Sequence, residues 1–187
     1  MTLPQVETLG AVFGASELGL SLFKRSRGNS QKADRGSLAL IWAVILATLV
    51  LCWFIRSALP QAPWLIPQSL YPFGAGVFAA GLLLRWYAIV YLGRWFTVDV
   101  AIATDHPVID SGPYRSIRHP SYTGVLLVFL GYGLCLGNWL ACLILVSVAT
   151  AVFLWRIAIE EKALLGALGP AYAAYMRRTR RLIPLLY

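Results

Sequence analysis

The chain has little charge and few of the residues that build soluble active sites. Charged residues make up 13% of its 187 residues, and hydrophobic residues 59%. It has only two histidines and three cysteines, and the cysteines lie inside apolar runs without metal-ligand spacing, so we expect no metal site. It contains no glycine-rich dinucleotide loop, no phosphate loop, and no GxSxG or HExxH motif. These absences argue against the common soluble enzyme classes and favour a membrane protein.

Five apolar segments are candidates for membrane-spanning helices. They are residues 5–23, 38–59, 69–92, 121–136 and 139–156. The run 121–156 is too long for one span at about 1.5 Å per residue, and its break at Gly137-Asn138 predicts a helical hairpin. We therefore expect an all-α integral membrane protein, a single multi-pass domain over residues 1–187 whose catalytic region is 93–187. No lysine or arginine precedes the first apolar run, so we expect no cleaved signal peptide.

The basic residues indicate which way the helices cross the membrane. The net charge is +8, and the basic residues gather in segments 24–36, 93–120 and 156–181. With five spans, all three segments fall on one side, which the positive-inside rule makes cytoplasmic, in a bacterial inner membrane or an ER-type membrane. Nucleic acid is not an expected partner, because no basic stripe alternates with stacking aromatics on a polar face. The arginines of segment 177–181 either close over a site or bind anionic lipid headgroups, and we favour lipid binding.

Two charges are expected inside the membrane. Glu17 and Arg85 lie at similar depths in the first and third spans, and intramembrane charges are usually paired. We therefore propose a Glu17–Arg85 pair, with separate contacts to water or headgroups as the alternative. Small residues in the third and fourth spans indicate close helix packing. They are Gly74, Gly76, Ala79, Ala80, Gly81, Gly124, Gly131, Gly133 and Gly137.

Two polar stretches interrupt the apolar pattern. One is GPYRSIRHPSYTG, residues 112–124, in which Pro120 suits the first turn of a helix and His119 precedes it. Free N–H groups at such a helix start can bind an anion, although Arg118 and His119 can equally anchor the helix at the headgroups. In the other stretch Arg156 and Glu160 are four residues apart and share a helix face. A guanidinium can hold a carboxylate and a carboxylate can hold an ammonium, although a simple surface ion pair is the alternative.

One pattern joins the two polar stretches to their surroundings: it runs from Leu84-Arg85 through GPYRSIRHPSYTG to Arg156, Glu160-Glu161, Gly169, Tyr172, Tyr175 and Arg178. This pattern resembles the isoprenylcysteine carboxyl methyltransferase family. The similarity covers roughly residues 70–187. It implies that S-adenosylmethionine is the methyl donor and is held on the cytoplasmic side, between the loop before span four and the C-terminal helix. It implies cofactor contacts from His106, Pro107, Val108, Ile109, Tyr114, His119, Pro120, Ser121, Tyr122 and Glu160, and places Arg156 at the substrate as the catalytic residue.

The resemblance implies methyl transfer to a lipophilic acceptor, an isoprenylcysteine-like or other lipid-like carboxylate. A carboxylate is already ionised at neutral pH, so this reaction needs positioning rather than a general base. A prenylated substrate and membrane lipids are the expected partners, and the oligomeric state stays open. A thiol, phenol or amine acceptor would need proton removal, for which His119 or Glu161 is available. The alternatives are an NADPH-dependent membrane reductase of the steroid-reductase type, which shares a related RHP-x-Y motif, and a non-enzymatic membrane scaffold.

Overall fold

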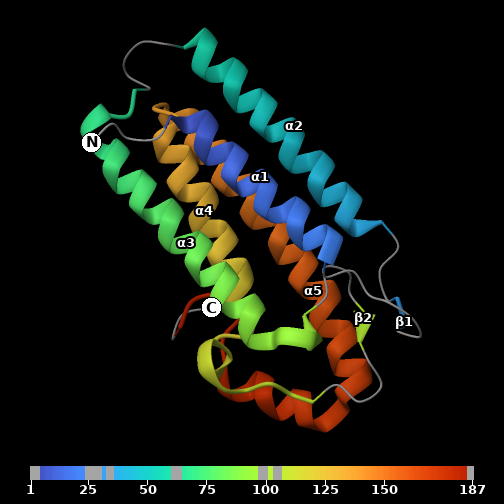
Figure 1. Cartoon of the computed structure of the whole chain (residues 1–187). Helices are drawn as coiled ribbons and strands as arrows, with labels where there is room; N and C mark the ends of the chain where they lie inside the picture. The colour runs from blue at the N-terminus through green and yellow to red at the C-terminus, as the bar shows by residue number, and fades with distance from the viewer. Residues whose placement is uncertain are drawn as a thin grey trace.

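The computed structural model describes residues 5–23, 31–32, 36–59, 65–96, 101–102 and 107–184. Within these ranges the regular elements are helices and one short ribbon of two strands (Figure 1). The α-helices are α1 (Val6–Phe23), α2 (Ser37–Ala58), α3 (Tyr71–Leu92), α4 (Pro120–Cys135) and α5 (Trp139–Arg178). Three short 3₁₀ helices are η1 (Gln68–Leu70), η2 (Gly93–Trp95) and η3 (Gly112–Arg115). The two-residue strands β1 (Gln31–Lys32) and β2 (Ala101–Ile102) pair antiparallel.

The helices differ in how well they suit a bilayer. Among the described residues, three helical stretches are long and apolar enough to cross one: Ser37–Ala58, Gln68–Trp95 and Trp139–Arg178. Helix α4 is apolar but has only 16 residues, about 24 Å at the helical rise, against a hydrocarbon core of about 30 Å. Helix α1 has 18 residues and includes Glu7 and Glu17. The apolar helices support an integral membrane protein.

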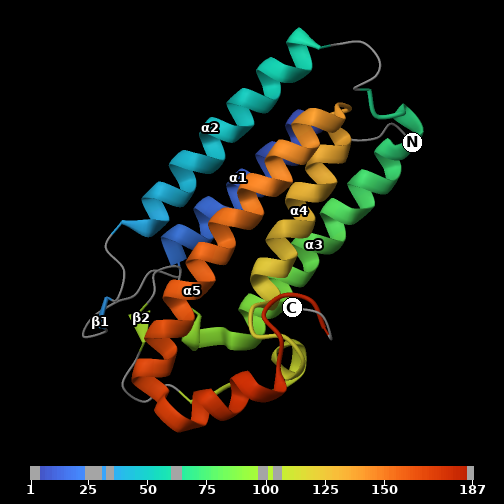
Figure 2. The same ribbon diagram turned by 180° about the vertical axis from the view of Figure 1, so that it is seen from behind.

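Helix α5 continues far beyond the expected span 139–156. It has 40 residues, about 60 Å at the helical rise, so much of it extends past a bilayer. It bends at Gly169, where φ is 57°, and the next residue is Pro170. A positive φ suits glycine, and proline removes a helical hydrogen bond, so the pair explains the kink. Beyond the kink the chain turns under the bundle and returns toward η3 (Figure 2).

Glycines bring α3 and α4 into backbone contact. A Cβ atom built on Gly81 would lie 2.6 Å from the carbonyl oxygen of Gly124, and one built on Gly124 would lie 2.6 Å from that of Gly81. The predicted close packing is thus confirmed at this interface, where α3 and α4 lie side by side in both views (Figures 1 and 2). It is wrong for Gly76, which has nothing within 4 Å of a built Cβ. It is also wrong for Gly137, whose φ of 76° belongs to the turn between α4 and α5.

The turn between α4 and α5 forms a tight hairpin, as the break at Gly137-Asn138 predicts. Asn138 caps α5, because its Oδ1 accepts a hydrogen bond from the Ala141 N–H at 3.1 Å. Its Nδ2 donates to the Leu59 carbonyl at 3.2 Å and so ties the hairpin to the end of α2.

Candidate active site

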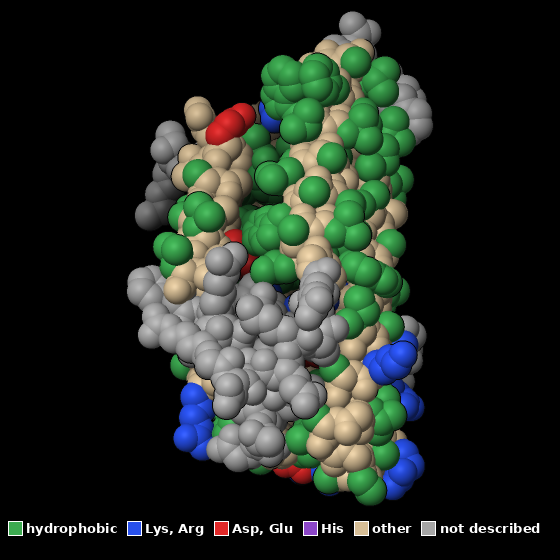
Figure 3. Space-filling model, turned by 90° about the vertical axis from the view of Figure 1, so that its right-hand side faces the viewer, with side chains coloured by type: hydrophobic (Ala, Val, Ile, Leu, Met, Phe, Trp, Pro, Cys, Tyr) green, Lys and Arg blue, Asp and Glu red, His purple; other side chains and the backbone are tan. Residues whose placement is uncertain are grey.

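A cavity of about 160 Å³ lies between the helices and continues toward the bend of α5. Its apolar arm is lined by α1 and α2, through Phe13, Ile41, Trp42 and Ile45, and by Phe129 and Phe153 on α4 and α5. The space-filling view shows a hollow lined by hydrophobic side chains between α1 and α2 (Figure 3). The apolar arm therefore suits a hydrophobic chain that lies against the helices.

An ion pair forms one wall of the cavity. Arg85 Nε donates to Glu17 Oε1 at 2.5 Å and Arg85 Nη2 donates to Glu17 Oε2 at 2.6 Å. The remaining nitrogen, Nη1, donates to Ser121 Oγ at 3.0 Å. All three residues are buried, and the predicted Glu17–Arg85 pair is confirmed. This bidentate geometry fixes the wall and links α1, α3 and α4 through one guanidinium.

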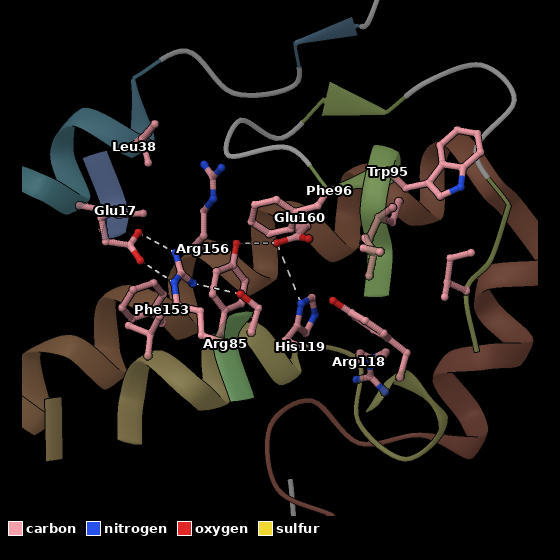
Figure 4. Close-up of a pocket in the computed structure, with 18 of the residues that line it drawn as sticks. Glu17, Leu38, Arg85, Trp95, Phe96, Arg118, His119, Phe153, Arg156 and Glu160 are labelled. Carbon is pink, nitrogen blue, oxygen red and sulfur yellow. Dashed lines mark hydrogen bonds and ion pairs between the residues drawn. The ribbon is translucent and has the colours of Figure 1, made fainter. Parts of the chain in front are cut away.

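His119, Tyr122 and Glu160 form a polar group in the lining of the cavity. Figure 4 shows the His119 ring beside the Glu160 carboxylate. His119 immediately precedes α4, and its ring stacks on Tyr122 with centroids 5.6 Å apart. The Tyr122 hydroxyl donates to Glu160 Oε2 at 2.8 Å, and His119 Nδ1 lies 4.0 Å from the same oxygen. Glu160 comes from α5, so the loop before α4 and the C-terminal helix converge on one carboxylate.

Arg156 lines the same cavity one helical turn before Glu160. Its side chain is buried, and it donates a hydrogen bond to the hydroxyl of Ser37 at the start of α2. The guanidinium carries five N–H donors in a fixed planar fork, and the Ser37 contact helps to orient it. Arg156 and Glu160 thus present opposite charges to one space, as their four-residue spacing indicates (Figure 4).

The second arm of the cavity is aromatic and lies toward the bend of α5. Tyr114, Tyr172 and Tyr175 line it, together with Trp95 and Phe96. The Tyr114 hydroxyl donates to the Ala88 carbonyl at 3.2 Å, and Tyr175 donates to the Tyr114 carbonyl at 2.7 Å. Burial, and then the nearby Glu160 carboxylate, raise the pKa of the Tyr114 hydroxyl above its ordinary value, so this tyrosine remains neutral. The arm is thus a surface of aromatic faces tied together by hydrogen bonds.

The structure brings most of the expected site residues together. Pro107, Val108, Ile109, Tyr114, His119, Ser121, Tyr122, Arg156 and Glu160 all line the cavity. Pro120 lies behind it, fully buried in the first turn of α4. His106 lies outside the described residues.

Glu161 is a buried partner of two arginines, a role that the sequence did not predict. It is buried, and it accepts hydrogen bonds from Arg118 Nε at 2.6 Å and from Arg181 Nε at 2.9 Å. Arg118 also donates to the carbonyls of Thr179 and Met176, at 2.6 and 3.2 Å, and so caps the C-terminal end of α5. The adjacent glutamates thus have different surroundings, because Glu160 lines the cavity and Glu161 binds two arginines. The only local signal was the Glu-Glu pair itself.

The fold and the cavity define a helical integral membrane protein whose polar site joins an apolar arm to an aromatic one. A family model described as the isoprenylcysteine carboxyl methyltransferase (ICMT) family matches residues 74–166. The chain is 35% identical over 113 residues to protein-S-isoprenylcysteine O-methyltransferase of Schizosaccharomyces pombe, covering 59% of this chain and 48% of the relative. It is 32% identical over 114 residues to protein-S-isoprenylcysteine O-methyltransferase B of Arabidopsis thaliana, covering 60% and 58%.

A solved structure also resembles this chain, here in its three-dimensional fold. It is described as the eukaryotic intramembrane Ras methyltransferase ICMT without a monobody, and it superposes with a TM-score of 0.61 at 26% identity. The match covers 79% of this chain and 53% of the other. Together these comparisons support the isoprenylcysteine carboxyl methyltransferase family for this chain. It spans about half the length of the curated relatives that it matches.

Proposed function

We propose that this protein is an integral membrane methyltransferase that moves a methyl group from S-adenosylmethionine to the carboxylate of a lipophilic, isoprenylcysteine-like acceptor. The observation that carries the proposal is the placement of Arg156 and Glu160 one turn apart on the wall of a cavity with an apolar and an aromatic arm. The relatives described above are named methyltransferases, which favours this function over the NADPH-dependent reductase and the scaffold.

The residues of the aromatic arm fit the chemistry of S-adenosylmethionine. Glu160 is a carboxylate that suits the ammonium of the amino acid part, and the Tyr122 hydroxyl donates a hydrogen bond to it. The faces of Tyr114, Tyr172 and Tyr175 suit an adenine ring and a cationic sulfur. Val108 and Ile109 add apolar surface. When bound, this donor supplies a methyl group activated by a sulfonium, which an ionised carboxylate accepts without proton transfer.

Arg156 is the proposed substrate-binding residue. Its guanidinium would hold the acceptor carboxylate while the apolar arm between α1 and α2 takes the acceptor's hydrocarbon chain. The buried Arg85 is bound by Glu17, whereas Arg156 lines the cavity one helical turn from Glu160, where the acceptor carboxylate would meet it. Aromatic walls exclude water, so positioning accounts for most of the rate enhancement, on the order of 7–11 kcal/mol in well-oriented reactions.

The proposed topology has five spans, with α1 and α4 crossing beside the three more apolar stretches. All basic segments of the sequence then lie on the side of the site, and the site faces the cytoplasm. The bend of α5 lies at this end of the molecule, where basic side chains also gather in the space-filling view (Figure 3). Residues 93–187 form the proposed catalytic region, within a single domain.

Calorimetric titration of the detergent-purified protein with S-adenosylhomocysteine tests the proposal. We expect saturable binding by the wild type and no response to NADPH. Glu160→Gln should lower the affinity at least about tenfold, because hydrogen bonds to charged groups contribute about 1.5–3 kcal/mol. Arg156→Lys is the matched variant at the acceptor end and should bind S-adenosylhomocysteine like the wild type. Binding of NADPH, or no binding by a well-folded wild type, would overturn the proposal.

Transfer of a radiolabelled methyl group to N-acetyl-S-farnesylcysteine then tests the acceptor. We expect transfer that Arg156→Lys reduces by about 100-fold or more, because lysine cannot form the two parallel bonds of a guanidinium with a carboxylate. The methyl ester of the same compound lacks the free carboxylate and should accept nothing. Equal labelling of the acid and the ester would point to another acceptor atom.

A further inference from the structure

Residues 179–184, called here the C-terminal strap, run beside the loop that carries His119. The strap lies beyond residues 74–166, the segment that the family model matches. The Arg118 and His119 N–H groups donate to the carbonyls of Arg180 and Arg181 at 2.7 and 3.0 Å, and the Arg180 N–H donates to Ser116 at 3.0 Å. Thr123 in the first turn of α4 donates to the Leu182 carbonyl at 2.7 Å. The strap is thus hydrogen-bonded on both sides of His119.

One side chain of the strap, that of Arg181, binds Glu161, the buried neighbour of Glu160. Arg181 Nε donates to Glu161 Oε2 at 2.9 Å, while Arg118 Nε donates to Glu161 Oε1 at 2.6 Å. Glu161 is only 4% exposed, so its carboxylate needs nearby donors, and Arg118 and Arg181 each bind one of its oxygens. Arg181 is partly exposed, and it binds the oxygen that Arg118 leaves.

Glu161 in turn faces the imidazole of His119. Its Oε1 lies 3.4 Å from His119 Nε2, and the other ring nitrogen, Nδ1, lies 4.0 Å from Glu160. A carboxylate only accepts hydrogen bonds, so Glu161 favours the tautomer with the proton on Nε2. In that tautomer Nδ1 is an acceptor, and the Glu160 carboxylate at 4.0 Å is beyond hydrogen-bond distance of it. The ring orientation and the tautomer of His119 therefore depend on where Glu161 is held.

We propose that Arg181 is a positioning residue of the active site, which acts through Glu161 to fix the orientation and tautomer of His119. This proposal rests on the proposed function for its effect on methyl-donor binding, but not for its effect on His119. A loosened Glu161 would weaken the donor site formed by His119, Tyr122 and Glu160 and leave the acceptor site at Arg156 intact.

The test compares Arg181→Gln with Arg180→Gln. Both variants remove one positive charge from the strap and keep its backbone bonds, but Arg180 is exposed and Arg181 binds Glu161. We expect Arg181→Gln to weaken S-adenosylhomocysteine binding about tenfold and to leave KM for the lipophilic acceptor within twofold, since a hydrogen bond between charged groups is lost at a partly exposed site. Arg180→Gln should change both by less than about twofold, and Arg181→Lys should recover most of the binding because it restores the charge.

A spectroscopic measurement reads His119 directly. The chain has two histidines, so ¹⁵N-histidine labelling gives few ring signals. The His106→Gln variant lacks the signals of His106, and the signals that remain belong to His119. We expect separated Nε2–H and Nδ1 signals for His119 in the wild type and in Arg180→Gln. In Arg181→Gln they should move toward each other as the two tautomers mix.

The two measurements separate the possible failures. Equal binding and equal His119 signals in the two variants would overturn the positioning role. A drop in thermal stability of Arg181→Gln with wild-type binding and signals would make Arg181 merely structural, which also overturns it. If the wild type does not bind S-adenosylhomocysteine, the methyltransferase proposal fails, while the His119 signals still decide whether Arg181 orients the imidazole.

Discussion

The contact between α3 and α4 differs in kind from the contact between α1 and the rest of the helical bundle. Between α3 and α4, Gly81 and Gly124 bring backbone against backbone, with no room for a side chain. Helix α1 is joined by side chains, through the Glu17–Arg85 ion pair, a hydrogen bond from Trp86 to Ser16, and the edge-to-face contact of Phe13 with Phe129. In lipid, close backbone packing provides much of the association between helices, whereas single polar contacts add about 1 kcal/mol each.

This contrast separates the framework of the site from one of its walls. Helix α4 follows directly from His119, and α3 carries Arg85, so the α3–α4 contact fixes the loop and the guanidinium relative to each other. Helices α1 and α2 supply the apolar arm of the cavity. Changes between α3 and α4 should therefore affect folding, and changes on α1 and α2 should affect the cavity more than the fold.

The largest effect is expected for Gly81→Leu. A side chain there meets the backbone of α4, which cannot move aside without separating the helices, so we expect a loss of more than about 3 kcal/mol and little folded protein. Size-exclusion profiles and thermal unfolding in detergent measure it. Gly76→Leu is the matched control on the same helix, because nothing lies within 4 Å of its built Cβ. Similar behaviour of the two variants would contradict the close contact.

A smaller effect is expected when the ion pair loses one partner. Glu17→Leu leaves the buried Arg85 without its carboxylate, and we expect a loss of about 2 kcal/mol, below the usual cost of breaking a buried pair, because Ser121 still accepts one bond. The double variant Glu17→Leu/Arg85→Met should recover most of the stability, since well-packed apolar residues often replace a buried pair without loss. Thermal unfolding of the wild type, the single variant and the double variant measures the difference. A double variant no more stable than Glu17→Leu would show that the pair is not the main link to α1.

The ion pair also shows what the sequence could predict. Glu17 and Arg85 are charges at similar depth in apolar segments, and burial without a partner is costly, so the sequence predicted the pair. Arg156 and Glu160 share a wall of the cavity because helical spacing alone puts them on one face. Both inferences depend only on helix geometry and the cost of burying charge.

The role of the strap could not be predicted in this way. Its contacts join Arg118 to Arg180 and Glu161 to Arg181, and they exist because α5 bends at Gly169 and the chain returns beneath α4. Glycine followed by proline indicates a break in a helix, but not the direction of the chain after it. The position of these arginines after the last apolar segment favours lipid headgroups as their partners. For Arg181 the structure gives Glu161 as a partner instead.

A modest effect is expected at the contact between α2 and the polar site. Ser37→Ala removes the hydroxyl that Arg156 binds, which should cost about 1 kcal/mol and raise KM for the acceptor about fivefold, with S-adenosylhomocysteine binding unchanged. Ser57→Ala on the same helix is the control, since its exposed hydroxyl donates to the Trp53 carbonyl one turn before it. A change in S-adenosylhomocysteine affinity in Ser37→Ala would mean that Arg156 serves the donor end of the cavity.

The smallest effect is expected for Ser16→Ala. The Ser16 hydroxyl accepts a hydrogen bond from Trp86 Nε1 at 2.8 Å, in an exposed position one residue before Glu17. An exposed indole finds other acceptors in water or headgroups, so we expect a loss of at most about 0.5 kcal/mol in thermal unfolding. If α1 is held mainly by the Glu17–Arg85 pair, Ser16→Ala should stay well below Glu17→Leu. A loss as large as that of Glu17→Leu would instead mean that several side-chain contacts along α1 share its attachment. The α1 and α3–α4 contacts would then differ in being made by side chains or by backbone, and no single contact would dominate the attachment of α1.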